Sequence, residues 1–279
     1  MLRQRVITGV TMVVLFLAAL AFLPLVGLAV LFAVLVSLGA WEWSRLAGLD
    51  SPLLRALYVG VTAACCAALF VVCELAGQPA RDEVQPFLGF AGFWWSFALL
   101  WIKGYPSSAV FWRTRVMRGL MGLLILVPAW LAAVYLLSFP RGGGLLLVMV
   151  LIVVAADVGA YFTGKAFGKH QLAAAVSPKK TWEGFWGGVA ACSALAVLFW
   201  IMLPNQIAHL SLGAIVAVTL ATSMASVVGD LTVSMVKRQS GVKDSGTLLP
   251  GHGGILDRLD SLCAAAPVFA LGLLLAGWQ

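Results

Sequence analysis

The sequence has few charged residues. Asp, Glu, Lys and Arg make up 10 % of its 279 residues, whereas they make up about 25 % of an average soluble protein. Hydrophobic residues account for 62 % of the chain and the mean hydropathy is +1.02, against about 45–50 % apolar residues in soluble domains. This composition excludes a water-soluble domain. Because repeated apolar runs of about 20 residues can cross a bilayer as helices, we expect a polytopic helical membrane protein.

Long linkers, low-complexity tracts and internal repeats are also missing. We therefore expect a single integral membrane domain over residues 1–279, with N-terminal helices in 1–140 and the polar motifs in 141–279. Cysteine is scarce, and every cysteine lies inside an apolar run, which favours small buried side chains over disulfides or metal ligands. The five cysteines are Cys65, Cys66, Cys73, Cys192 and Cys263.

The apolar runs predict an all-α bundle of about nine transmembrane helices. The first run covers residues 6–23, and the second ends near Trp41-Glu42-Trp43, whose aromatic rings suit a membrane interface. The remaining runs cover residues 53–75, 84–103, 118–139, 143–165, 183–204, 209–229 and 259–278.

The basic residues predict the orientation of this bundle. With a cytoplasmic N-terminus that begins with Arg3 and Arg5, only Arg81 and Arg141 among the 18 Lys and Arg residues would fall outside. This bias follows the positive-inside rule. Membrane topology therefore explains the net charge of +7, and nucleic-acid binding is not needed to explain it. We expect the protein in the inner (cytoplasmic) membrane, with its polar motifs facing the cytoplasm and its C-terminus outside.

Most acidic residues of the first half lie near span ends or in loops. Asp82 and Glu83 fall in an outer loop, and Glu42 and Glu74 are expected to reach interfacial water. Asp157 differs because it lies about eight residues inside the sixth span. An ionised group in a membrane is costly and therefore a functional candidate. A structural carboxylate paired with a neighbouring helix is the alternative.

Two segments after Asp157 carry further candidates. The loop Ser177-Pro-Lys-Lys-Thr181 presents Lys179 and Lys180, which either bind phosphate as point charges or anchor the loop at the membrane surface. If the eighth span continues past the membrane, Asp230, Ser234, Lys237 and Arg238 share one helix face.

The stretch that follows, up to Asp260, is the most polar part of the chain. It contains Lys243-Asp244 and a glycine-rich turn around His252, which either contacts a ligand or stays in water. Asp257 and Asp260 lie three residues apart and therefore point to one side of the last span. Together with Asp230 they would offer three hard oxygen ligands for Mg²⁺, which commonly binds carboxylates and substrate phosphates together.

The pattern S-x-x-K-R-x4-K-D-x-G-x3-P-x-H-G-G-x2-D-R-x-D over residues 234–260 resembles the signature of the phosphatidate cytidylyltransferases. The segments 157–168 and 177–184 are similar to secondary motifs of that family. The resemblance covers residues 150–262. It implies the reaction CTP + phosphatidate → CDP-diacylglycerol + pyrophosphate, dependence on Mg²⁺, a second potassium-type cation, and a homodimer among membrane lipids.

This resemblance also suggests roles for single residues. Asp230, Asp257 and Asp260 would hold the metal, and Asp244 would order Lys243 or a metal-bound water. Cations would orient the triphosphate or the lipid headgroup, or attract the anionic substrate: Lys179, Lys180, Lys237, Arg238, Lys243 and Arg258. The other polar motif residues are predicted to bind substrate: Asp157, Ser177, Thr181, Ser234 and His252.

Two other functions deserve comparison. An ion-coupled transporter could use Asp157 and Asp230, but transporters tend to place their sites at the midplane between internal repeats. Here no repeat is visible and the polar residues gather toward one face of the membrane. A CDP-alcohol phosphotransferase would carry a D-G-x2-A-R start to its Asp-rich motif, which this sequence lacks.

Overall fold

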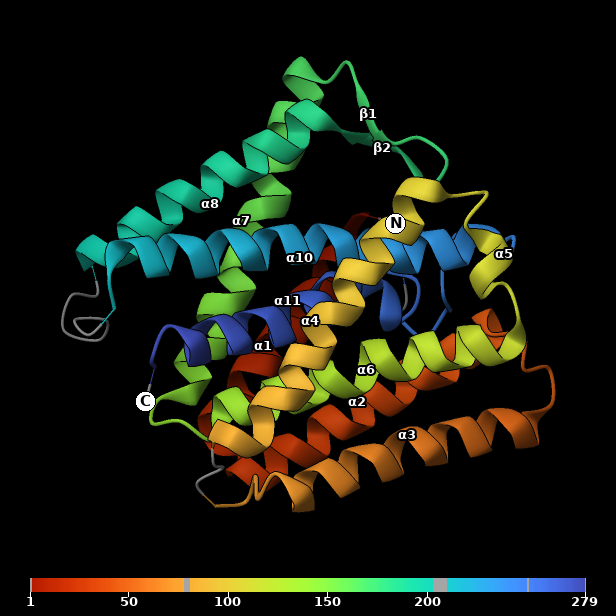
Figure 1. The fold of residues 1–279 in the computed structure, drawn as a ribbon, viewed down its shortest axis with the longest axis horizontal. Helices are drawn as coiled ribbons and strands as arrows, with labels where there is room; N and C mark the ends of the chain where they lie inside the picture. Colours follow the sequence, from red (N-terminus) through yellow and green to blue (C-terminus); the bar gives the residue numbers. More distant parts are fainter. Residues whose placement is uncertain (1, 78–80, 203–209, 250, 279) are drawn as a thin grey trace.

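The computed structural model describes residues 2–77, 81–202, 210–249 and 251–278, with side chains from residue 6 onward. The side chains of Arg3 and Arg5, and Pro250 of the signature, lie outside the described residues. In chain order the elements in Figure 1 are α1 Leu2–Phe22, α2 Leu25–Leu46, α3 Pro52–Val72, α4 Arg81–Gly104, α5 Ala109–Trp112, α6 Arg115–Leu137, α7 Gly142–Phe167, β1 Gln171–Ala173, β2 Ser177–Thr181, α8 Trp182–Met202, α10 Leu212–Gln239 and α11 Leu256–Leu275.

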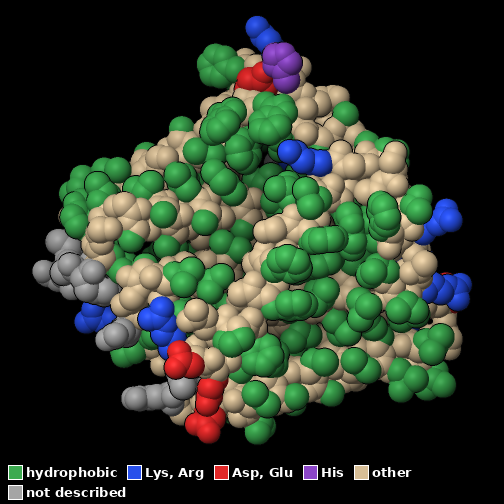
Figure 2. All heavy atoms as spheres, in the orientation of Figure 1, with side chains coloured by type: hydrophobic (Ala, Val, Ile, Leu, Met, Phe, Trp, Pro, Cys, Tyr) green, Lys and Arg blue, Asp and Glu red, His purple; other side chains and the backbone are tan. Residues whose placement is uncertain are grey.

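The predicted all-helical membrane bundle is confirmed. Within the described residues, eight helices are long and apolar enough to span a bilayer, and a shorter apolar helix covers Val6–Phe22. The long helices are α2, α3, α4, α6, α7, α8, α10 and α11. Figure 2 shows hydrophobic side chains over much of one face, with most charged side chains near its edges. That distribution is expected of a surface that contacts lipid.

The chain departs from the predicted all-helical pattern at one place. Between α7 and α8, where a loop was expected, β1 and β2 form an antiparallel hairpin that pairs Gln171 with Thr181 and Ala173 with Ser177. Successive side chains of a strand point to opposite sides. The hairpin therefore sends the neighbouring residues Lys179 and Lys180 in different directions.

Helices from both halves of the chain pack around α11, which contacts α10, α6 and α4. The hairpin and the adjoining ends of α7 and α8 project at the top of Figure 1, while both helices also contact α10. Helices α10 and α11 approach closely at Gly229, where an added Cβ would collide with the carbonyl oxygen of Asp260 and with Ala264. Glycine at this position therefore lets the two helices that carry the signature cross in contact.

Neutral polar side chains join the helices of the first half. Trp43 Nε1 donates to the carbonyl oxygen of Arg118 (2.7 Å), Tyr58 Oη to that of Gly119 (2.8 Å), and Trp130 Nε1 to that of Ala29 (2.9 Å). All five cysteines are free, and four of them are buried, as predicted.

Two predictions for the acidic residues are wrong. Asp82 and Glu83 lie in the first turn of α4 rather than in a loop, and Glu83 is half-buried. Glu74 is exposed as expected, but Glu42 is only 2 % exposed. The sequence places Glu42 at a span end, where interfacial water is usual. In the structure the segment before α11 covers it and supplies hydrogen-bond donors.

Candidate active site

Two ion pairs lie along the C-terminal part of α10. Lys180 Nζ of the hairpin lies 2.5 Å from Asp230 Oδ2. Further along, Lys237 Nζ lies 2.7 Å from Asp257 Oδ1 of α11, and the two side chains are only 10 % and 6 % exposed. Buried charges are costly unless they are paired and hydrogen-bonded. These contacts therefore tie the hairpin, α10 and α11 together at one end of the bundle.

The predicted continuation of the eighth span is confirmed, because α10 runs on to Gln239. Ser234 Oγ donates to Asp230 Oδ1 over 3.1 Å, as expected for residues one turn apart. Arg238 is exposed and turns toward the hairpin, where its Nε donates to the carbonyl oxygen of Val176 over 3.3 Å.

Two further carboxylates interact with these ion pairs. Asp260 is 9 % exposed and interacts electrostatically with Asp230, Lys237 and Lys180. Asp157 of α7 interacts with Lys180 and Asp230. The charge cluster, defined as Asp157, Lys180, Asp230, Lys237, Asp257 and Asp260, therefore combines four carboxylates with two ammonium groups. An excess of carboxylates near lysines suits a polyanionic substrate that arrives with a cation.

The segment between α10 and α11 folds over the C-terminal end of α10. Asp257 Oδ2 accepts hydrogen bonds from the backbone N–H groups of Ser245 (2.9 Å) and Gly254 (3.0 Å). The turn closes through Leu249 N, which donates to the carbonyl oxygen of Gly253 over 2.9 Å. Gly253 has a φ of +85°, in the left-handed region that favours glycine. This explains one glycine of the signature.

The other predicted residues lie at the margin of the cluster. Lys179, Lys243 and Asp244 are exposed, and Ser177 begins β2. Thr181 Oγ1 accepts a hydrogen bond from Gly184 N (3.1 Å), so it caps the start of α8.

The side chain of Arg258, in the first turn of α11, reaches back to His252 in the preceding turn. Arg258 Nη2 donates to the backbone carbonyl of His252 over 2.9 Å. His252 Nδ1 is buried without a hydrogen-bond partner among the described residues. His252 is therefore not fully exposed to water, which was one of the two alternatives from the sequence. Its Nδ1 also makes no hydrogen bond to the described residues.

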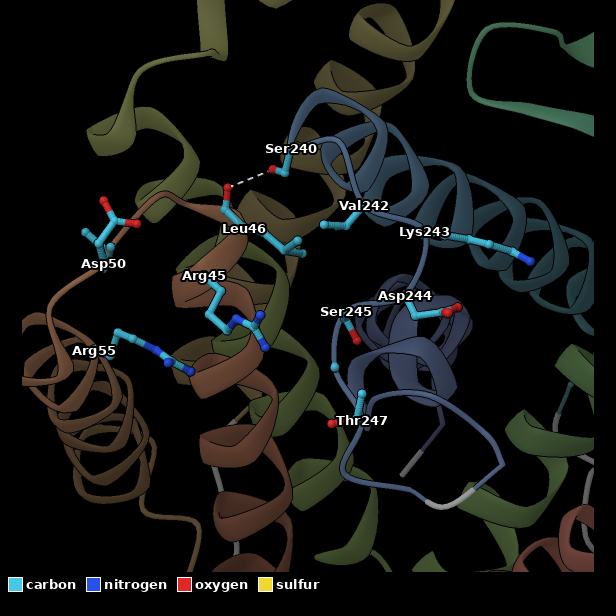
Figure 3. A pocket seen from close by; sticks show the side chains of 12 residues that line it. Arg45, Leu46, Asp50, Arg55, Ser240, Val242, Lys243, Asp244, Ser245 and Thr247 are labelled. Atoms are coloured by element: carbon cyan, nitrogen blue, oxygen red, sulfur yellow. Dashed lines mark hydrogen bonds between the residues drawn. The ribbon is translucent and has the colours of Figure 1, made fainter.

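A pocket of about 520 Å³ lies beside the same segment. Figure 3 shows Arg45 and Arg55 on one side of it and residues 240–247 on the other, with the Lys243 side chain directed away from both arginines. Arg55 stacks on Trp41, with its guanidinium carbon 3.8 Å from the ring centroid. Sequence reasoning singled out neither arginine, because positive charge at a span end is explained by topology alone.

The three predicted metal ligands do not converge in this structure. Among the described residues, no three Asp, Glu, His or Cys side chains are arranged to hold a metal ion. Both oxygens of Asp257 accept hydrogen bonds from protein donors, whereas Asp230 and Asp260 lie on the two helices that cross at Gly229. Metal binding by these carboxylates remains a prediction.

Comparison with known proteins shows to which family the chain belongs. Residues 3–276 match the model of the cytidylyltransferase family. The chain belongs to the cytidylyltransferase family. A relative from Pseudomonas aeruginosa named phosphatidate cytidylyltransferase is 44 % identical over 278 residues, covering 100 % of this chain and 99 % of the relative.

Other relatives with the same name support the assignment. The Haemophilus influenzae protein is 40 % identical over 283 residues, covering 97 % of this chain and 98 % of its own length. A Staphylococcus epidermidis protein is 46 % identical over 124 residues, which is 44 % of this chain and 46 % of the relative. The family resemblance predicted from the signature is thereby confirmed for the whole chain.

Proposed function

We infer that this cytidylyltransferase-family protein transfers a cytidylyl group from CTP to phosphatidate and releases CDP-diacylglycerol and pyrophosphate. The observation that carries the proposal is the charge cluster, because it gathers lysines and an excess of carboxylates at one end of an otherwise apolar bundle. A site with this composition suits a water-soluble polyphosphate that reacts with a lipid phosphate at the membrane surface.

The reaction needs little proton chemistry from the protein. A phosphate oxygen of phosphatidate attacks the α-phosphorus of CTP, and a P–O bond forms as the bond to the β-phosphate oxygen breaks. Pyrophosphate leaves with the bonding electron pair. A phosphate monoester carries about −1.5 to −2 charges at pH 7, so the attacking oxygen is already anionic. Positioning and electrostatic stabilisation therefore dominate.

The lysines of the cluster are placed for that electrostatic work. Lys180 and Lys237 hold their ammonium groups against carboxylates, and an arriving phosphate offers each an alternative anionic partner. Four exposed cations lie on β2, α10, α11 and the segment between the last two, the elements that carry most of the cluster, and would guide both anionic substrates toward it. They are Lys179, Arg238, Lys243 and Arg258.

We propose that Mg²⁺ binds with the nucleotide. Asp230 and Asp260 fit this role, since they are hard oxygen donors on adjoining helices, and Asp257 would join them only by exchanging its Lys237 contact. When bound, such a cation offsets the charge that develops on the transferred phosphates. The potassium-type cation and the homodimer implied by the family resemblance are also proposed, as is Asp244 as a partner of Lys243.

We further propose that the charge cluster faces the cytoplasm in the inner membrane. The positions of the two basic residues that were predicted to lie outside agree with this orientation. Arg81 begins α4 and Arg141 precedes α7, at the left of Figure 1 and away from the hairpin. The orientation would bring the site to the compartment that holds CTP.

The test is turnover of radiolabelled CTP with phosphatidate by the purified full-length protein in detergent, with Mg²⁺ and then with EDTA. We expect CDP-diacylglycerol with Mg²⁺ and none with EDTA. Lack of product from folded protein under both conditions would overturn the proposal and direct attention to ion transport through Asp157 and Asp230. Equal turnover with EDTA would overturn only the metal requirement.

A further inference from the structure

Glu42 is a buried carboxylate outside every motif discussed so far. It lies near the C-terminal end of α2, in the half of the chain that carries no part of the signature. Its Oε2 accepts hydrogen bonds from Ser245 Oγ (2.7 Å) and Leu256 N (2.9 Å), and its Oε1 accepts one from Ile255 N (3.0 Å). The three donors lie 203 to 214 positions further along the sequence.

These contacts cap the helix that bears the catalytic candidates. The first N–H groups of any helix lack partners within the helix. Ile255 immediately precedes α11, and its side chain makes no capping hydrogen bond. Glu42 supplies the missing acceptor from another helix, and its negative charge lies at the positive end of the α11 dipole. Glu42 therefore fixes where α11, with Asp257 and Asp260, begins.

Glu42 and Asp257 hold the same segment through different groups. Ser245 donates its hydroxyl to Glu42 and its backbone N–H to Asp257. Gly254 donates its N–H to Asp257, while a Cβ added to it would collide with Glu42. A Cβ added to Gly246 would also collide with Glu42. The carboxylate therefore fits a cradle that only glycines leave open.

The contacts continue from this cradle into the charge cluster. Ser245 links Glu42 to Asp257, and Asp257 holds the Lys237 ammonium at 2.7 Å. We propose that Glu42 is a positioning residue for cytidylyl transfer, which sets the placement of the α10–α11 segment and of Asp257. This inference rests on the proposed function for its catalytic consequence, but the structural consequence can be measured separately.

Glu42→Gln tests the proposal with a side chain of nearly the same shape. The amide keeps one acceptor oxygen and turns the other into a donor, so at least one of its backbone partners loses its acceptor. We expect kcat to fall on the order of 10²-fold, the effect of a displacement of about 1 Å at a site. KM for CTP should change less than kcat, because Lys179 and Arg238, two of the cations proposed to guide CTP, lie on β2 and α10, outside the segment that Glu42 positions.

Hydrogen exchange provides the readout that does not depend on activity. In Glu42→Gln, the backbone amides of residues 245–257 should exchange faster, while those in the middle of α6 should not change. The matched control is Glu74→Gln, which makes the same chemical change at an exposed position after α3. It should alter neither kcat nor exchange in residues 245–257.

Ser245→Ala covers the case in which Glu42→Gln does not fold. This variant removes one hydrogen bond to Glu42 and leaves the two backbone contacts with α11, so kcat should fall less than in Glu42→Gln. Exchange should rise at residues 245–257 here too. Unchanged kcat with unchanged exchange in Ser245→Ala would overturn the proposal when Glu42→Gln cannot be studied.

The outcomes separate the two proposals. An inactive wild-type protein would overturn the proposed function, and exchange in Glu42→Gln would still decide whether Glu42 positions the segment. Unchanged exchange at residues 245–257 would overturn the positioning role. Faster exchange with normal kcat would confine Glu42 to folding and would equally overturn its role in catalysis.

Discussion

The helices before residue 140 and those after it differ in the partners of their charged side chains. In the first half, the buried Glu42 and the half-buried Arg118 bind neutral partners: Glu42 accepts from N–H and O–H donors, and Arg118 Nη1 donates to the carbonyl oxygen of Leu46 (2.6 Å). In the second half, opposite charges meet directly in the Lys180–Asp230 and Lys237–Asp257 pairs.

This difference has a functional meaning. A hydrogen bond to a fixed carbonyl or backbone N–H joins helices and occupies the atoms of the charged group, so that these atoms are not available to a ligand. A lysine paired with a carboxylate can exchange its partner for a phosphate, and the carboxylate is then available to a cation. We infer that the first half serves as a scaffold and that the second half retains its charges for substrates.

The largest effect should come from breaking the most buried ion pair. Asp257→Asn removes the carboxylate that is ion-paired with the Lys237 ammonium, in a site where the lysine side chain is 10 % exposed. Loss of one partner of a buried pair costs about 3–5 kcal/mol, so the unfolding temperature should fall and turnover should be lost. Thermal unfolding in detergent and CTP turnover measure the two effects.

A double variant separates stability from catalysis at this pair. Asp257→Asn with Lys237→Met removes both charges of the pair, while the amide oxygen can still accept from the backbone N–H groups of Ser245 and Gly254, and loss of both partners costs far less than loss of one. We expect stability to recover while activity stays absent. If turnover recovered as well, the pair would serve folding only. The inference that the second half retains its charges for substrates would then be wrong for this pair.

A second prediction concerns the two neighbouring lysines of β2. Lys180→Ala leaves Asp230 without its 2.5 Å partner, and kcat/KM should fall on the order of 10²-fold, as when a charge-stabilising donor is removed. Lys179→Ala removes an exposed cation, and we expect a smaller effect, confined mainly to KM. Steady-state kinetics at several CTP concentrations would distinguish them, and equal effects would contradict the distinction.

These lysines also show what the sequence could and could not predict. The motif made Lys179 and Lys180 equivalent, with phosphate binding and membrane anchoring equally open. Their side chains point in different directions because both residues lie in a β-strand. That strand forms by pairing with Gln171–Ala173, and no alternating apolar pattern in the sequence predicts it. By contrast, the membrane helices were predictable because each apolar run is set by the thickness of the bilayer.

The face of α10 was predictable for a similar reason. Asp230 and Ser234 lie one turn apart, so helical periodicity alone brings them together. Glu42 was placed wrongly because its partners are more than 200 positions away and two are backbone groups, which leave no trace in side-chain patterns. An acidic residue inside an apolar run was the available signal, and it also fits a residue at the membrane interface.

A third, smaller effect is expected in the scaffold. Trp130→Phe keeps an aromatic ring but removes the donor to the Ala29 carbonyl, a 2.9 Å bond between α6 and α2. The net loss should be about 1 kcal/mol of unfolding free energy, with kcat unchanged. Denaturation in detergent together with turnover would check this. A large fall in kcat with normal stability would show that the first half contributes to catalysis beyond Glu42.

The smallest effect should come from an exposed ion pair of the first half. Arg115 Nη2 lies 3.1 Å from Asp50 Oδ2, but the side chains are 66 % and 84 % exposed. Exposed pairs contribute little because water and salt screen them. Arg115→Ala should therefore change the unfolding free energy by less than about 0.5 kcal/mol and leave kcat unchanged. An effect as large as that of Lys180→Ala would mean that exposure does not separate structural from functional charges here.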